Sequence, residues 1–300
     1  MPSLKDYRDR IASVKSTKKI TSAMKMVAAS KLKKAQDQAE SSQPYAQAMG
    51  EMLARVAAGV TVTDASPKLL IGTGSDKTHL LIVVTSDRGL CGGFNGNLVR
   101  LARNEILRLK ADGKDVQIIT VGRKAKDLLK REFGSQIIKS FEGIGAGSRV
   151  QFSEANEVTQ FVLEQFDASN FDICSIVYNN FVSVLTQQPN AQQIIPFKLP
   201  ETSNDNADEE GADKLVSPYA FEPEENEILG LLLPRNLGVQ MFRALLDSAA
   251  GEQAARMTAM DNATRNAGDK INDLNLEYNR ARQAAITTEL IEIISGAEAV

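Results

Sequence analysis

The sequence predicts an α/β protein in which a long antiparallel coiled coil of the N- and C-terminal helices carries a small α/β domain with a largely parallel sheet. Two apolar stripes with helical spacing support this fold class. One runs through Leu4–Ala39 without Pro or Gly, and the other runs through Arg235–Ser295 without Pro. Between them, short aliphatic runs alternate with helical patterns, as in sheets built from βαβ units.

The first stretch has the features of one long helix. Ser3 can cap its N-terminus, with Asp6 as the capping partner three residues later. Forty helical residues span about 60 Å, whereas ordinary helices average about 12 residues, so a coiled coil is indicated. The apolar stripe consists of Leu4, Tyr7, Ile11, Val14, Ile20, Met24, Val27, Ala28, Leu32, Ala35 and Ala39.

The last stretch has a matching stripe in which steps of four and three alternate from Ala267 to Ala285. Its members are Ala249, Gln253, Met257, Met260, Thr264, Ala267, Ile271, Leu274, Tyr278, Ala281 and Ala285. The small residues among them permit close approach of a slim partner. The N-terminal helix is the natural candidate, because both helices are too long to be covered by one globular core. We call the expected pair the shaft.

The middle of the chain alternates strands and helices. Strands are expected at Leu80–Ser86, Val116–Gly122 and Asp172–Tyr178, with edge strands at Val182–Thr186 and Gln193–Phe197. Helices are expected at Asn97–Lys110, Arg123–Phe133 and Glu154–Phe166. The domain boundaries that follow are 1–58 for the N-terminal shaft helix, 76–200 for the α/β domain, 201–217 for an acidic mobile loop and 218–300 for the C-terminal shaft helix.

Charge is divided into two poles, although the net charge is only −3. The first 34 residues carry ten Lys and Arg against two Asp, and Glu201–Glu227 carries ten Asp and Glu against one Lys. Such asymmetry indicates partners. A nucleic-acid-binding arm is the alternative interpretation of the basic pole. A solvated or protein-facing helix is favoured, because the apolar stripe requires a protein partner.

Several kinds of site are disfavoured by composition. Cys91 and Cys174 are solitary and far apart, so neither a disulfide framework nor a zinc site is expected. His79 is the only histidine and is interpreted as a structural residue at the start of a strand. No apolar run reaches the roughly 18 residues needed to span a bilayer. The basic N-terminus lacks the apolar segment of a secretory signal.

The glycine-rich segment Thr85–Asn97 lies between a predicted strand and a predicted helix. Its spacing is G-x-x-G-G-x-x-G, which matches neither the dinucleotide fingerprint nor the phosphate-binding loop, and it contains no Lys. A tight structural turn is therefore favoured over a nucleotide site. Asp87 and Arg88 could form an acid–base pair, but we favour an ion pair that fixes the turn.

With these residues in view, the chain resembles the gamma subunits of bacterial F-type ATP synthases. The resemblance is carried by four blocks that lie along the whole chain, namely Arg10–Lys31 (RIASVKSTKKITSAMKMVAASK), Ser86–Asn95 (SDRGLCGGFN), Glu252–Met260 (EQAARMTAM) and Tyr278–Thr287 (YNRARQAAIT), followed by Ile294–Val300 (ISGAEAV). The insertion that carries the regulatory dithiol of the chloroplast relatives is absent. No transit-peptide pattern precedes the first helix, which favours a bacterial origin.

The resemblance implies a non-catalytic subunit without cofactors or metal. It implies a central rotor shaft that couples rotation of a membrane-embedded c-ring to conformational cycling of a catalytic ring. The expected partners are three alpha and three beta subunits, the epsilon subunit and the c-ring. The expected location is peripheral, on the cytoplasmic face of the bacterial inner membrane.

The resemblance also implies which residues meet partners. Those that would face the beta subunits are Met24, Arg282, Gln283 and Thr287. Those that would occupy an apolar sleeve at the top of the ring are Leu290, Ile293 and Ile294. A turn at Pro44–Tyr45 and the segment Tyr219–Glu222 are candidates for the foot on the c-ring. From the pattern alone, Arg282 and Gln283 could equally belong to a solvated helix face.

Two other function classes stay open at this point. A nucleotide-binding enzyme would use the α/β domain, and its residues 79–199 alone would bind nucleotide saturably. A coiled-coil nucleic-acid binder would show an affinity for DNA or RNA that falls steeply with salt.

Overall fold

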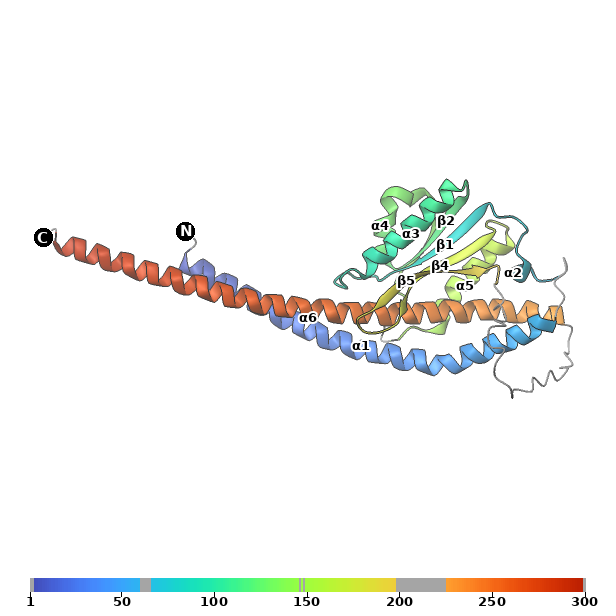
Figure 1. Cartoon of the computed structure of the whole chain (residues 1–300), viewed down its shortest axis with the longest axis horizontal. Helices are drawn as coiled ribbons and strands as arrows, with labels where there is room; N and C mark the ends of the chain where they lie inside the picture. Colours follow the sequence, from blue (N-terminus) through green and yellow to red (C-terminus); the bar gives the residue numbers. More distant parts are fainter. Residues whose placement is uncertain (1–2, 60–65, 146, 148, 198–224, 299–300) are drawn as a thin grey trace, which may run out of the picture.

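Two long helices dominate the molecule (Figure 1). The computed structural model describes residues 3–59, 66–145, 147, 149–197 and 225–298, and the long helices are α1 (Leu4–Gly59) and α6 (Glu225–Glu298). Hydrogen bonds across them join Arg8 with Tyr278, Thr21 with Thr264 and Lys25 with Asp261. Apolar clusters across them contain Leu32 with Ala254, and Leu53 with Leu233. One number falls as the other rises, so the predicted antiparallel pairing is confirmed.

The start of α1 is capped as predicted. The Asp6 backbone N–H donates to Ser3 Oγ at 3.2 Å, and the Ser3 backbone N–H donates to Asp6 Oδ2 at 2.9 Å. This reciprocal pair satisfies donors that the helix itself leaves unpaired.

The seam of the shaft mixes small apolar residues with polar pairs. Ala28 and Leu32 of α1 are buried, as are Ala254, Ala267 and Leu274 of α6. The small side chains of Ala28, Ala254 and Ala267 allow the two backbones to approach closely along the helices.

Two members of the predicted α1 stripe do not lie in the seam. Ile20 and Val27 are 56% and 57% exposed. Thr21, which is buried, takes the seam position between them and accepts a hydrogen bond from Thr264 Oγ1 at 2.8 Å. The apolar pattern therefore misplaced this part of the seam by one residue, because a polar pair occupies it.

The expectation of a turn at Pro44–Tyr45 is wrong, because both residues lie inside α1. Proline at this position removes one helical hydrogen bond. Burial beyond it favours continuation, since Leu53 and Val56 pack with Leu229 and Leu233 of α6 in one apolar cluster. The expected start of the last helix also moves, from Arg235 back to Glu225, so that Pro234 is internal.

The α/β body holds a five-stranded sheet in the order β3-β2-β1-β4-β5. Its strands are β1 (Thr78–Val84), β2 (Asp115–Val121), β3 (Ile137–Phe141), β4 (Ile173–Phe181) and β5 (Gln187–Ile195). All neighbouring pairs are parallel except β4 with β5. The prediction of a largely parallel sheet is therefore confirmed.

Helices cover both faces of this sheet. They are α3 (Phe94–Ala111), α4 (Arg123–Phe133) and α5 (Phe152–Asp167), with a short α2 (Lys68–Ile71) before the first strand and a 3-10 turn at Gly134–Gln136. Buried residues of α3 and α4 join Leu81 and Val83 in one core cluster. Buried residues of α5 and α6 join Leu80 and Ile82 in the other. The shaft helix α6 thus forms part of the wall of the body (Figure 1).

Three expectations about the edges of the sheet change. Val182–Thr186 is not a strand but the connection between β4 and β5, and its Val182 and Leu185 are 58% and 83% exposed. The strand expected at Gln193–Phe197 begins earlier, at Gln187, and ends at Ile195. β3 was not expected, because Ile137–Phe141 is short and contains Lys and Ser. The acidic segment 201–217 lies outside the described residues.

Candidate functional site

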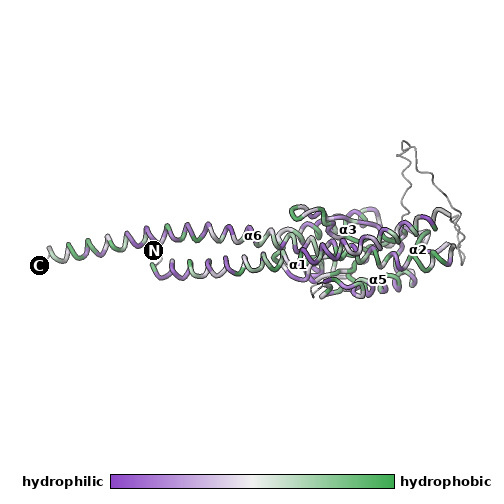
Figure 2. The backbone as a smooth tube through the Cα atoms, turned by 90° about the horizontal axis from the view of Figure 1, so that it is seen from below, coloured by the Kyte–Doolittle hydropathy of each residue, from purple (hydrophilic) through white to green (hydrophobic). Residues whose placement is uncertain are grey.

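The far end of α6 is a single helix that extends beyond its partner. Arg8, close to the start of α1, donates to the Tyr278 hydroxyl from Nε at 3.0 Å and from Nη2 at 2.8 Å. After Tyr278, α6 continues to Glu298, which adds about 20 residues or roughly 30 Å of helix. Figures 1 and 2 show this extension, which we call the tip, as the end of the molecule most distant from the body.

The tip carries an apolar stripe without a partner in the described part of the chain. Its large apolar side chains are Ile286, Leu290, Ile291, Ile293 and Ile294, exposed by 48%, 53%, 58%, 68% and 57%. Positions 286, 290, 293 and 294 follow the spacing of one helix face. An exposed apolar stripe of this size marks an interaction surface. The predicted residues Leu290, Ile293 and Ile294 all belong to it.

The tip also carries the predicted polar residues Arg282, Gln283 and Thr287, which are exposed. The Thr287 hydroxyl donates to the Gln283 backbone carbonyl at 2.9 Å. Its proton is therefore committed to its own helix, whereas the Arg282 guanidinium and the Gln283 side-chain amide make no hydrogen bond or ion pair with a described residue. Both present donors outward, in an arrangement suited to carboxylates.

The other predicted interface residues lie elsewhere. Met24 is partly buried on α1, beside the seam and next to the body. Tyr45 is 49% exposed on the part of α1 that runs alongside the body. Tyr219 lies outside the described residues. The interface predicted from sequence is thus divided between separate regions of the molecule.

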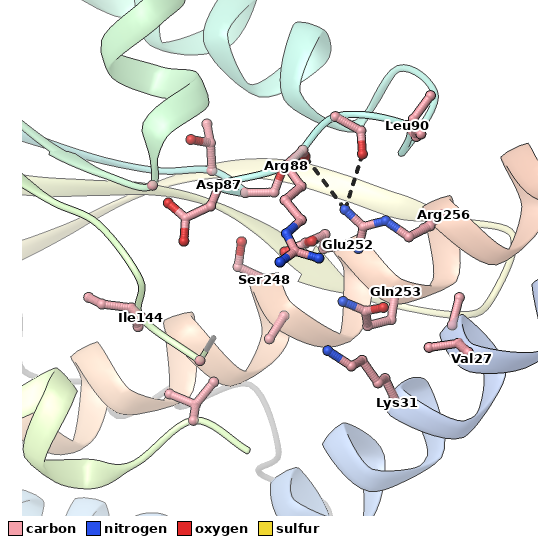
Figure 3. A pocket seen from close by; sticks show the side chains of 18 of the residues that line it. Val27, Lys31, Asp87, Arg88, Leu90, Ile144, Ser248, Glu252, Gln253 and Arg256 are labelled. Carbon is pink, nitrogen blue, oxygen red and sulfur yellow. Dashed lines mark hydrogen bonds and ion pairs between the residues drawn. The ribbon is translucent and has the colours of Figure 1, made fainter. Parts of the chain in front are cut away.

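The glycine-rich turn docks against the shaft through Arg256 of α6 (Figure 3). Its Nη1 pairs with Glu252 Oε1 at 2.6 Å, and its Nη2 donates to the backbone carbonyls of Gly89 at 3.3 Å and Arg88 at 3.5 Å. Burial raises the pKa of Glu252, and Arg256 opposes that rise. One guanidinium therefore fixes the turn to the helix and compensates a buried acid.

Close packing supports this contact. A Cβ at Gly251 would lie 3.2 Å from Phe94 Cε2, so glycine allows the first residue of α3 to approach α6. Gly92 has a φ of 58° and faces Ala259. Leu90 adopts a φ of 65°, an uncommon backbone region for a residue with a side chain.

The interior of the turn is held by its own side chains. Asn95 is buried, accepts from the Ser86 backbone N–H at 3.1 Å and donates to Ser86 Oγ at 2.8 Å. Asn95 Nδ2 also lies 3.2 Å from Cys91 Sγ. These bonds favour the interpretation of Thr85–Asn97 as a structural turn.

Asp87 and Arg88 are both described, and they do not form the expected ion pair with each other. Its carboxylate accepts from the backbone N–H groups of Arg123 and Gly143, both at 2.9 Å. The two side chains point apart (Figure 3). Asp87 therefore joins the turn to the ends of β2 and β3, a long-range role that adjacency in sequence did not indicate.

Arg256 and Glu252 were missed as functional residues, although a signal was present. They stand four residues apart on a helix, the spacing at which Glu and Arg pair. No pattern in the sequence indicated that the glycine-rich turn would supply the remaining acceptors.

The remaining chemistry-bearing residues are structural. His79 Nε2 lies 2.6 Å from Asp76 Oδ1. Cys91 and Cys174 are buried free thiols, and burial raises the pKa of Cys174. Within the described ranges, no group of three or more His, Cys, Asp or Glu side chains is placed to hold a metal ion.

Comparison with protein families identifies relatives over the full chain. The family model for ATP synthase matches residues 3–300. ATP synthase gamma chains from Parvibaculum lavamentivorans, Paramagnetospirillum magneticum and Rhizobium etli are 55%, 54% and 53% identical over 300 residues, covering 100% of this chain and of each relative.

Solved structures agree with the fold. A chain of the central stalk and c-ring of the Tetrahymena thermophila mitochondrial ATP synthase has a TM-score of 0.58 at 28% identity, covering 81% of this chain and 99% of that chain. A chain of the Euglena gracilis mitochondrial ATP synthase has a TM-score of 0.67, covering 99% of this chain and 94% of that chain. At 20% identity the second match shows the fold alone.

Proposed function

This chain belongs to the ATP synthase gamma-chain family, and on that premise we propose that it is the central rotor shaft of a proton-translocating F-type ATP synthase. In this proposal the chain catalyses no reaction itself. It transmits torque from a c-ring to a catalytic ring of three alpha and three beta subunits, whose sites change conformation in sequence as the shaft turns.

The observation that carries the proposal is the tip of α6. A single helix with an exposed apolar stripe is not stable by itself in water, because most helical stability comes from packing of an apolar face. A surrounding sleeve of partner subunits would cover the stripe and still allow rotation, since apolar contacts are not directional. Arg282 and Gln283, at the base of the stripe, would meet beta-subunit carboxylates at particular angles of rotation.

The opposite end supports a second contact. We propose that the body, with the epsilon subunit, forms the foot on the c-ring, and that Tyr45 and Tyr219 take part in this contact. Among the described residues no helix is long and apolar enough to cross a membrane. Attachment to the membrane would then be peripheral, through the c-ring, on the cytoplasmic face of a bacterial inner membrane.

Single-molecule rotation tests this function. Leu107, which is 47% exposed on α3, can be replaced by Cys and labelled, because Cys91 and Cys174 are buried. The labelled chain is assembled with its alpha and beta subunits, which are fixed to a surface. ATP is expected to drive rotation of the label in one direction with three dwell positions per turn.

A matched control uses Leu290→Asp/Ile294→Asp in the same labelled chain. Charges in the apolar stripe are expected to weaken assembly, because an unpaired carboxylate is costly to bury. If the label stays fixed while the surrounding ring hydrolyses ATP, the chain is not a rotor. Normal assembly and rotation of the Asp variant would remove the sleeve contact from the proposal.

A further inference from the structure

A cavity of about 650 Å³ lies between α1, the glycine-rich turn and α6. Residues that follow the carboxyl ends of β1 and β2, including Thr85 and Gly122, form one of its walls. Doubly wound sheets bind ligands in the crevice outside the carboxyl ends of their strands. The volume also falls within the range of about 300–1,000 Å³ that is typical of small-molecule sites.

The two carboxylates at this cavity are already occupied. Glu252 pairs with Arg256, and Asp87 accepts two backbone N–H groups. Arg256 is the main cation that opposes the raised pKa of Glu252, and the charge of Lys31 opposes it more weakly.

Two of the three cations that line the cavity are in the opposite situation. The side chains of Lys31 on α1 and Arg88 in the turn make no hydrogen bond or ion pair with described residues, and they point into the same space from opposite sides (Figure 3). Ser248 and Gln253 of α6 also line it and have no hydrogen bonds to described residues. The polar capacity left over is thus two positive charges with a hydroxyl and an amide.

The mouth of the cavity is apolar. Ile20, Val27 and Leu90 line it, and they are among the exposed large apolar side chains of the molecule, at 56%, 57% and 64%. A ligand that covers them would remove apolar surface from water. Leu90 reaches this position only through the uncommon backbone conformation with positive φ described above.

We propose that this cavity binds a small organic anion with an apolar body. Lys31 and Arg88 hold a carboxylate or phosphate group between them, while Ser248 and Gln253 complete its hydrogen bonds. The apolar body rests on Val27 and Leu90 at the mouth. Such a ligand bridges the turn and both shaft helices, so its binding would stabilise the docking of the body on the shaft.

Calorimetric titration of the full chain with three naphthalene compounds tests the site. Naphthalene-2-carboxylate and 2-naphthyl phosphate are expected to bind saturably, and the neutral naphthalene-2-carboxamide is expected to bind at least about tenfold more weakly. The stronger of the two anions identifies the head group that the cavity prefers. Both should raise the midpoint of thermal unfolding, because they bind only the folded chain.

Substitutions locate the binding. Lys31→Gln and Arg88→Gln are each expected to weaken the anion by about tenfold or more, because each removes a charge-assisted hydrogen bond. The matched controls are Lys33→Gln and Arg100→Gln, which change exposed cations away from the cavity and should leave affinity unchanged. Unfolding midpoints without ligand verify that all four variants fold.

Three results would overturn the proposal. They are no saturable binding of either anion, equal binding of the amide, and equal affinity in the cavity variants and the controls. The same titration on the assembled complex is expected to give the same affinity. Loss of binding on assembly would show that a partner subunit, and not a free ligand, occupies the cavity.

Discussion

At the scale of single residues, Asp247 shows how burial in the shaft acts on a charge. It lies on α6 beside a second cavity of about 500 Å³ between α1 and α6. Burial raises the pKa of Asp247 to about 6, and Arg243 only partly opposes that effect. No hydrogen bond of its carboxylate to another described residue compensates the burial. The folded chain is therefore destabilised by an ionised carboxylate at neutral pH.

This destabilisation predicts a dependence on pH. The folded pKa of about 6 lies above the unfolded value of about 3.9, so the folded chain binds more protons between these values. Stability should therefore fall as the pH rises from about 4 to about 6. Asp247→Asn should remove this decline and raise the free energy of unfolding at pH 7 by about 1 kcal/mol, after allowance for solvent screening.

Urea unfolding of both proteins at several pH values measures the difference. Asp261→Asn is an informative comparison, because its carboxylate is paired with Lys25 and the pKa of Asp261 is lowered. That variant should lose stability at pH 7. An unfolding free energy of Asp247→Asn that stays parallel to that of the parent chain from pH 4 to pH 7 would contradict the account.

Residue roles were the least predictable from sequence. The apolar stripe placed Ile20 in the seam, but Thr21 lies there, because a pair of threonine hydroxyls can satisfy each other when buried. Asp87 was assigned to its neighbour Arg88, yet it accepts from Arg123 and Gly143. These partners are distant in the chain, and only the fold brings them together.

At the scale of elements, periodicity predicted most of the architecture. The helix expected at Arg123–Phe133 has the observed bounds, and its Ala125, Leu129 and Phe133 are buried on one face. The sequence patterns mispredicted strands where the strand propensity of a segment and its burial in the fold disagree. Val182–Thr186 has strand-forming residues but no core to cover it, and β3 has a weak pattern yet pairs with β2.

Proline was a poor guide to helix ends in the shaft. Pro44 and Pro234 lie inside α1 and α6, although each removes a helical hydrogen bond. Apolar contacts on both sides of these residues favour an uninterrupted helix. Leu229 and Leu233, which precede Pro234, are buried against Leu53 and Val56. Tertiary packing thus outweighed local propensity at both positions.

The pairing of α1 and α6 can be tested by a crosslink. Thr21 Oγ1 and Thr264 Oγ1 lie 2.8 Å apart, so Thr21→Cys/Thr264→Cys should form a disulfide within one chain under mild oxidation. The closed loop is long, so unfolding should become harder by up to about 4 kcal/mol. Gel mobility without reductant and urea unfolding measure both effects.

The matched control is Ile20→Cys/Thr264→Cys. Ile20 is 56% exposed and lies outside the seam, so this pair should crosslink far more slowly. If the first pair gives only dimers between chains, or if both pairs react equally, the register derived for the shaft is wrong. In an assembled rotor the disulfide should leave ATP hydrolysis intact, because both helices turn together.

At the scale of the whole molecule, body and shaft are continuous. α6 contributes Leu237, Met241 and Leu245 to the core of the body and then continues into the tip. Arg256 adds a polar attachment to the glycine-rich turn. A torque applied to the body is therefore transmitted into the tip through one helix, without a linker between them.

Arg282 and Gln283 form an exposed polar pair on that tip. If the pair only faces solvent, Arg282→Ala should change stability by less than about 0.5 kcal/mol and leave activity unchanged. If it meets carboxylates of a beta subunit, charge-assisted hydrogen bonds of about 1.5–3 kcal/mol are lost at one rotary position. Such a loss would slow stepping without abolishing rotation, because the asymmetric shaft still pushes sterically.

We therefore expect lower ATPase activity and weaker assembly in Arg282→Ala, with residual proton coupling, and a larger effect in Arg282→Ala/Gln283→Ala. Steady-state hydrolysis and proton pumping into membrane vesicles measure these quantities. Arg280→Ala is the control, since two residues along a helix place its side chain about 200° away from Arg282. Normal turnover, assembly and pumping in the double variant would assign both residues to a solvated helix face.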